Sequence, residues 1–96
     1  MRLRYDPRAI QDLQDIRDYL TAQASAKAAE VIRRHLRARI ERLGAHPFIG
    51  IATDNPDIRV LPPTRYPYRI YYTVRGDEVV ILHIRHTARR MPADLP

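Results

Sequence analysis

Two amphipathic segments separated by only about two or three residues constrain this fold more than any other feature. The first runs from the N-cap Asp6, with Pro7 at the first helical position, to about Ala22. The second follows the N-cap Ser25 and runs to Leu43. Because so short a connection returns the chain alongside itself, the spacing predicts an antiparallel helical hairpin.

Each segment carries an apolar stripe at helical spacing. The stripes comprise Ile10, Leu13, Ile16 and Leu20 in the first segment and Ala29, Ile32, Leu36, Ile40 and Leu43 in the second. Asp12, Asp15 and Asp18 fall about half a turn from the first stripe, so we expect these carboxylates to face water. Gly44 is expected to end the second helix.

Strand-forming residues dominate the second half of the chain. A short strand is predicted over 58–61, and two longer strands over 68–74 and 79–86 are expected to form a hairpin. A further extended segment covers 3–5, whereas 47–57 has the composition of a loop. The order is therefore β-α-α-β-β-β, which predicts an α+β fold with the helical hairpin packed on a small, mainly antiparallel sheet.

The turn between the two long strands decides which residues share a face of the sheet. With a two-residue turn at Gly76-Asp77, one face carries Arg69, Tyr71, Thr73, Val80, Leu82, Ile84 and His86. The other face then carries Tyr68, Ile70, Tyr72, Val74, Val79, Ile81, His83 and Arg85. A turn one residue longer would reverse one strand relative to the other.

The size and charge of the chain limit its function. A chain of 96 residues forms one domain, 1–96, which excludes separate cofactor and substrate domains. All of the 17 basic residues except Lys27 are arginine, and the formal net charge is +6. Arginine suits carboxylates and phosphates, so we expect an acidic partner, either a polynucleotide or a peptide. Cysteine, a membrane-spanning run and an apolar signal core are absent from the sequence, which predicts a cytoplasmic protein.

The common catalytic and metal-binding patterns are missing from the sequence. Ser25 is the only serine and serves better as a cap, and three scattered glycines make no phosphate-binding loop. His83 and His86 are three residues apart on a predicted strand and point to opposite faces, while His35 and His46 lack partners at ligand spacing. We therefore expect no metal and no cofactor.

Arginines cluster first along the second helix. They flank its apolar stripe, with Glu30 and Glu41 among them, and comprise Arg33, Arg34, Arg37, Arg39 and Arg42. This rim either only solvates the helix or contacts an acidic segment of a partner.

A second cluster follows the last two strands and their ends. It comprises Arg65, Arg69, Arg85, His86, Arg89 and Arg90, interleaved with Tyr66, Tyr68, Tyr71 and Tyr72. Guanidinium groups beside aromatic rings hold phosphates and stack bases, and a histidine moves protons, so the cluster suits an RNA-cleaving surface. Residue types alone favour a simpler interpretation, a sheet packed by tyrosines and solvated by arginines, and spacing does not decide between the two.

Longer motifs across the same region resemble a known family. They are RYPYRIYYTV at 65–74 and VILHIRHTARR at 80–90, with AIQDLQDI at 9–16, IERL at 40–43 and the Leu61-Pro62 entry to the hairpin. In this order and spacing they resemble the ParE-type toxins of the RelE/ParE superfamily, over nearly the whole chain. The family's fold has the same β-α-α-β-β-β order.

The resemblance implies the toxin of a type II toxin–antitoxin system of the plasmid stabilisation type, kept inactive by an acidic, ParD-like antitoxin. RelE-like members are ribosome-dependent mRNA endonucleases, whereas ParE-like members poison DNA gyrase and block replication. Arg69 and Arg89 fall where the nucleases keep catalytic arginines. However, 59–61 lacks the lysines or acidic residue of the nucleases, and the tail 91–96 has neither tyrosine nor histidine to act as acid or base.

We therefore expect a gyrase-binding poison rather than an enzyme. The expected target-binding residues are Arg65, Arg69, Arg85, His86, Arg89 and Arg90. The expected antitoxin-binding residues are Arg33, Arg34, Arg37 and Tyr71, since an acidic antitoxin segment would wrap the hairpin over 8–43 and reach the sheet. One alternative is a ribonuclease with Arg69, His86 and Arg89 as catalytic residues and the ribosome and mRNA as partners. Another is an inactive member that only binds.

Overall fold

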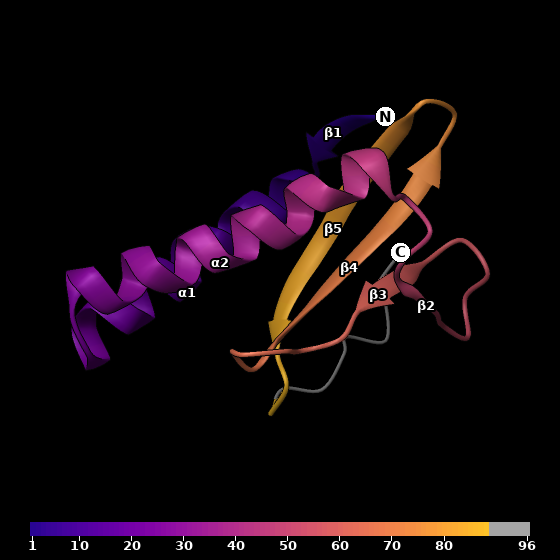
Figure 1. The fold of residues 1–96 in the computed structure, drawn as a ribbon. Coiled ribbons are helices and arrows are strands. Elements are labelled where there is room, and N and C mark those ends of the chain that lie inside the picture. Colours follow the sequence, from indigo (N-terminus) through magenta and orange to yellow (C-terminus); the bar gives the residue numbers. More distant parts are fainter. Residues whose placement is uncertain (89–96) are drawn as a thin grey trace.

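Two helices cover one face of a five-stranded sheet in the computed structural model, which describes residues 1–88 (Figure 1). The elements are β1 (Arg2–Tyr5), α1 (Pro7–Gln23), α2 (Ala26–Ala45), β2 (Ile51–Ala52), β3 (Arg59–Leu61), β4 (Tyr68–Arg75) and β5 (Glu78–His86). The predicted α+β class and helical hairpin are confirmed. The short β2 is an addition, because it lies where the sequence predicts only a loop and forms by pairing with β3.

The strand order in the sheet is β1-β5-β4-β3-β2. β1 runs parallel to β5, and the other neighbouring strands are antiparallel, which confirms a mainly antiparallel sheet. β1 pairs only with the first half of β5, from Glu78 to Ile81. The second half of β5 is therefore left without a strand neighbour on that side, and α1 lies there instead.

The predicted N-caps of both helices are confirmed. The Asp6 carboxylate accepts a hydrogen bond from the backbone N–H of Arg8 at 2.9 Å, and Pro7 follows at the first helical position. The Ser25 hydroxyl oxygen accepts one from the backbone N–H of Ala28 at 3.0 Å. Neither of these two helices, within the described 1–88, is long and apolar enough to cross a membrane.

The prediction that Gly44 ends the second helix is wrong. α2 continues to Ala45, and His46 is the C-cap, with its N–H donating to Arg42 O at 2.9 Å. Gly44 allows a close approach of the N-terminus instead: a Cβ at this position would lie 3.1 Å from the carbonyl oxygen of Met1. The N-terminal amine of Met1 also donates to Gly44 O at 2.6 Å, so the start of β1 is fixed against the end of α2.

The main core lies between the helices and the sheet. It contains Ala9 of α1, Leu36, Ile40 and Leu43 of α2, and Leu61, Tyr68, Ile70, Tyr72, Val79, Ile81 and Ile84 of the sheet. Burial of each large aliphatic side chain contributes roughly 1.5–3 kcal/mol, so this layer holds the hairpin on the sheet. Ile10, which the stripe assigns to the core, is 46% exposed, because α1 begins at the edge of the sheet and Ala9 contacts it instead.

A β-bulge changes which residues of the β4–β5 hairpin share a face of the sheet. The predicted two-residue turn is confirmed, with Gly76 at φ 57°. Farther along, Tyr71 pairs with His83 but Tyr72 pairs with Ile81, so Leu82 is an extra residue on β5. The bulge reverses the alternation of every β5 residue beyond it.

The predicted faces are therefore wrong for the end of β5. Ile84 and His86 lie on the helix-covered face with Ile70 and Tyr68, their cross-strand partners, whereas Arg85 lies opposite Arg69. The sheet face away from the helices carries a second buried cluster. It consists of Ile58, Tyr71, Val80 and Leu82, with Val60 packed against it.

Asp12 does not face water as predicted. Its carboxylate accepts a hydrogen bond from the backbone N–H of Ile84 at 2.9 Å and contacts His83 Nδ1 at 3.2 Å. These groups lie on the part of β5 that β1 leaves unpaired, so Asp12 satisfies a strand edge in place of a neighbouring strand. Asp15 and Asp18 are exposed, as expected.

Candidate functional site

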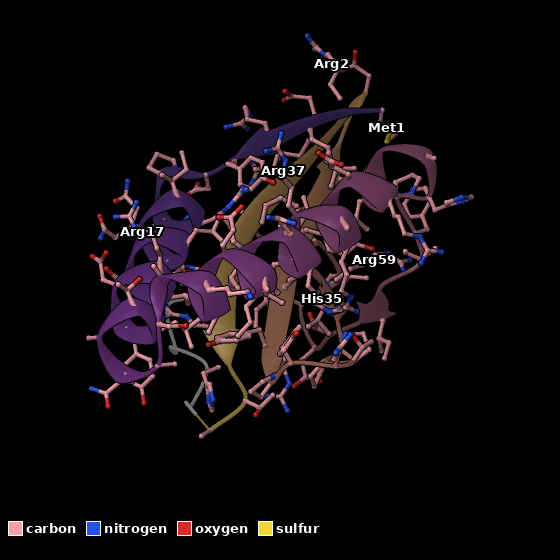
Figure 2. The ribbon with its side chains drawn as sticks, turned by 60° about the vertical axis from the view of Figure 1, so that its left-hand side comes forward. Met1, Arg2, Arg17, His35, Arg37 and Arg59 are labelled. Atoms are coloured by element: carbon pink, nitrogen blue, oxygen red, sulfur yellow. The ribbon has the colours of Figure 1, made fainter. Side chains whose placement is uncertain are left out.

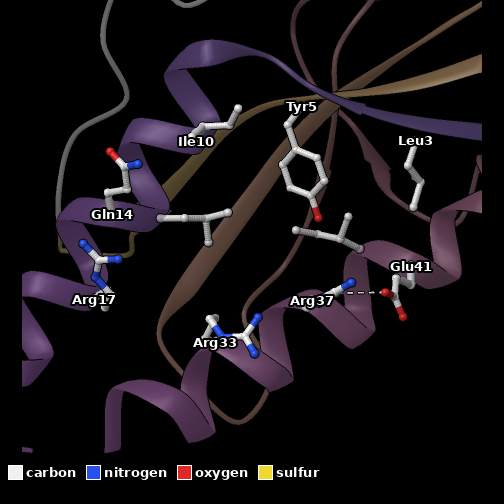
Figure 3. Close-up of a pocket in the computed structure, with 10 residues that line it drawn as sticks. Leu3, Tyr5, Ile10, Gln14, Arg17, Arg33, Arg37 and Glu41 are labelled. Atoms are coloured by element: carbon white, nitrogen blue, oxygen red, sulfur yellow. Dashed lines mark hydrogen bonds and ion pairs between the residues drawn. The ribbon is translucent and has the colours of Figure 1, made fainter. Parts of the chain in front are cut away.

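A groove of about 390 Å³ lies between α1, α2 and β1 (Figure 3). Its lining comprises Leu3, Tyr5, Ile10, Leu13, Gln14, Arg17, Arg33, Arg37, Ile40 and Glu41. We call this hollow the hairpin groove. Its walls are mostly apolar, and the arginines of both helices lie along them, so it suits an amphipathic segment with acidic flanks.

The apolar wall of the hairpin groove comes from β1 and the first turns of α1. Leu3 and Tyr5 lie on alternate positions of β1 and both point towards α2, as Figure 3 shows. Burial raises the pKa of Tyr5 above its ordinary 10.0, so its hydroxyl stays protonated and can donate a hydrogen bond at neutral pH. Ile10 adds an exposed aliphatic side chain from α1.

Among residues 1–88, the basic rim of the hairpin groove is paired with exposed carboxylates. Arg33 donates two hydrogen bonds to Glu30, at 2.9 and 2.7 Å, and Arg37 donates to Glu41 at 3.0 Å. Hydrogen bonds from Arg33 and Arg34 lower the pKa of Glu30 to about 2. Because solvent screens such exposed pairs, they contribute little to stability, and the carboxylates of a partner can replace them at little cost.

Figure 2 shows two arginines of the groove, Arg17 beside α1 and Arg37 on α2 near β1. Of the expected antitoxin-binding residues, Arg33 and Arg37 line the hairpin groove together. Arg34 shares Glu30 with Arg33 but does not line the groove. Tyr71 is buried on the face of the sheet away from the helices, so the structure does not bring it to the same place.

The expected target-binding residues are spread around the end of the β4–β5 hairpin. Arg65 precedes β4 and lies over the ring of Tyr66 at 5.7 Å, and Arg69 Nη1 reaches Thr87 O at 3.5 Å. Arg85 is the cross-strand partner of Arg69. Arg89 and Arg90 lie outside the described residues.

His86 lies on the other face of the hairpin from Arg69. Its ring packs edge-on against Tyr68, with centroids 5.5 Å apart, and its Nδ1 accepts a hydrogen bond from the backbone N–H of Ala88 at 3.1 Å. The ring lines a second hollow of about 190 Å³, together with Asp12, Asp15, Ile16, Tyr19, Tyr68, Ile84 and Ala88. Because of the bulge, Arg69 and His86 do not converge on one substrate atom.

Two of the other three histidines have packing partners, and His46 is exposed. His35 packs edge-on against Tyr66 at 4.9 Å and contacts Thr64 Oγ1 at 3.3 Å, and His83 is buried beside Asp12. Residues 1–88 contain no group of three or more His, Cys, Asp or Glu side chains placed to hold a metal ion.

Sequence reasoning missed several residues that line the hairpin groove. Leu3, Tyr5 and Arg17 line the groove without being among the expected binding residues, and the apolar stripe predicts a core position for Ile10. The sequence does contain an indication of the exposure of Ile10. The small residue Ala9 next to it can face the sheet instead, and Ile10 then lies towards solvent. The groove itself depends on where β1 joins the sheet, which local patterns do not encode.

Comparisons with known proteins agree with this fold. The family model of the ParE toxin of the type II toxin–antitoxin system, parDE, matches residues 3–91. A structure of the chromosomal ParDE system from P. aeruginosa aligns with a TM-score of 0.81 at 25% identity, covering 90% of this chain and 95% of that chain. No curated protein sequence gives a significant match.

Two E. coli structures share the fold at lower identity. The isolated RelE toxin aligns with a TM-score of 0.67 at 17% identity, covering 93% of this chain and 86% of that one. The intact RelBE toxin–antitoxin complex aligns with a TM-score of 0.66 at 18% identity, covering 93% and 98%.

Proposed function

Because the chain belongs to the ParE toxin family of type II toxin–antitoxin systems, we propose that it inhibits DNA gyrase by binding and is neutralised by a cognate acidic antitoxin. The observation that carries this proposal is the family match over residues 3–91. The toxin would act in the cytoplasm, where gyrase and DNA are found. It would bind and block its target without itself catalysing a reaction.

The separation of Arg69 from His86 supports binding over catalysis. RNA cleavage by a protein site needs a base, an acid and phosphate-binding cations around one phosphate. Among residues 1–88 the candidate base His86 lies on the helix-covered face of the sheet and Arg69 on the opposite face. The arginines Arg65, Arg69 and Arg85, with Arg89 and Arg90, are proposed to contact gyrase instead.

The hairpin groove supports the proposed antitoxin. A disordered acidic segment that folds on binding gains affinity by burying apolar side chains in a preformed groove. The apolar residues Tyr5 and Ile10 supply that surface, while Arg17, Arg33 and Arg37 surround it with positive charge. This complementarity, in a chain of net charge +6, favours an acidic partner segment in the groove.

Two assays run in parallel test the target. The purified protein is expected to inhibit DNA supercoiling by gyrase and to leave mRNA intact on programmed ribosomes. Supercoiling that proceeds at the uninhibited rate would contradict the proposal. Loss of toxicity in Arg69→Ala, together with transcripts cut at the ribosomal A site by the unmutated protein, would favour the ribonuclease instead.

A further inference from the structure

Arg69 and Arg85 are directly opposite each other on β4 and β5. Both side chains are half-buried, on the face of the sheet away from the helices. Like charges in this position repel each other, and a sheet normally places opposite charges or apolar groups there. None of the ion pairs within residues 1–88 involves either arginine.

The hydrogen bonds of this pair are incomplete. The Nε atom of Arg85 is buried and has no acceptor among the described residues. Arg69 Nη1 has only a long contact, 3.5 Å, to the carbonyl oxygen of Thr87. A buried guanidinium nitrogen without an acceptor is costly, and an anion that bridges the two arginines would relieve both the repulsion and the missing hydrogen bonds.

We propose that the Arg69–Arg85 pair binds a carboxylate side chain of the acidic antitoxin. The inference rests on the proposed function, since it presumes that partner. The site lies on the sheet face opposite to the hairpin groove. An antitoxin that occupies both places holds the sheet from two sides and covers arginines proposed to contact gyrase.

The surroundings of the pair favour a carboxylate over a nucleic acid. Single-stranded RNA or DNA binds through exposed rings that stack on bases and through a line of cations. The aromatic neighbour on this face, Tyr71, is 7% exposed and packs with Val80 and Leu82, so its ring is not available for stacking. Two half-buried guanidinium groups beside an apolar cluster suit one planar anion that each can hold through paired N–H groups.

Calorimetric titration with the purified cognate antitoxin tests the inference. Arg85→Gln and Arg69→Gln are each expected to weaken binding by at least about tenfold, the loss that follows removal of a hydrogen bond to a charged group. Arg75→Gln is the matched control. It removes the same charge from the same hairpin, but Arg75 is exposed and pairs across the strands with the acidic Glu78.

The outcomes separate this inference from the proposed function. Retained affinity in Arg75→Gln with a loss in both other variants would support it. Equal losses in all three variants would overturn it and leave the toxin–antitoxin assignment intact. Unchanged antitoxin affinity with weakened binding of a single-stranded RNA oligonucleotide would overturn it in favour of a phosphate site. An unmutated toxin that binds no acidic antitoxin would overturn both the inference and the proposed neutralisation.

Discussion

The hydroxyl of Tyr72 accepts a hydrogen bond from the backbone N–H of Gly50 at 2.8 Å. Tyr72 is fully buried in the main core, and Gly50 belongs to the segment that leads from α2 to β2. The bond therefore ties the outermost, two-residue strand β2 to the centre of the sheet. It also leaves no room for a side chain at position 50.

Gly50→Ala is expected to destabilise the protein by about 1–3 kcal/mol, the usual cost of overpacking a core. The new Cβ would lie 2.5 Å from the Tyr72 hydroxyl oxygen and 2.6 Å from a ring carbon, and neither atom belongs to a flexible chain end. Urea unfolding followed by circular dichroism measures the change in free energy. Gly44→Ala is the comparison, because its Cβ contact at 3.1 Å is less severe. A larger loss at Gly44 than at Gly50 would contradict the argument.

Stability is expected to fall as the pH drops below about 6.5. Burial is the largest cause that holds the pKa of His83 below its ordinary 6.5, against the hydrogen bond and charge of Asp12, which raise it, and the charges of Arg85 and Arg8 lower it further. Below pH 6.5 the unfolded chain therefore binds this proton more readily than the folded one, so the free energy of unfolding decreases with falling pH. His83→Gln should flatten the profile between pH 7 and about 5. His46→Gln, which changes an exposed histidine, should not.

Local signals predicted the parts of the fold that depend on few residues. The caps at Asp6 and Ser25 are each satisfied by a backbone N–H two or three residues away, so their residue types were enough. The turn at Gly76 needs a positive φ that glycine adopts readily, and it too was correct.

The errors arose where distant segments meet. Asp12 looks like a solvated carboxylate on the helix, but a strand edge 72 residues away supplies its N–H donor. No residue type in the sequence indicates the bulge at Leu82. The strand is aliphatic there, and an aliphatic side chain can pack on either face of the sheet. That single extra residue places His86 on the face of the hairpin opposite to Arg69, although the sequence pattern predicts that the two share a face.

Ile10→Asp is expected to weaken antitoxin binding by at least about tenfold, because it places a carboxylate on the apolar wall of the hairpin groove. Val31→Asp is a closely matched control. Both are aliphatic residues on the helices with nearly equal exposure, 46% for Ile10 and 45% for Val31, and Val31 does not line the groove. Titration calorimetry of both variants gives the comparison. If the two substitutions cost the same affinity, the antitoxin does not occupy this groove.

Salt is expected to slow the association of toxin and antitoxin more than it accelerates their dissociation. The rim arginines Arg33 and Arg37 are 43% and 62% exposed at their side chains, so their attraction acts over the solvent and mainly during encounter. Raising ionic strength from about 0.01 M to about 0.15 M shortens the Debye length from about 30 Å to about 8 Å, which removes most of that attraction.

Stopped-flow association and dissociation rates separate the two effects. In Arg33→Gln combined with Arg37→Gln, association should be slower at low salt and less sensitive to added salt. A dissociation rate that carried most of the salt dependence would instead indicate that these charges are buried in the complex and paired there.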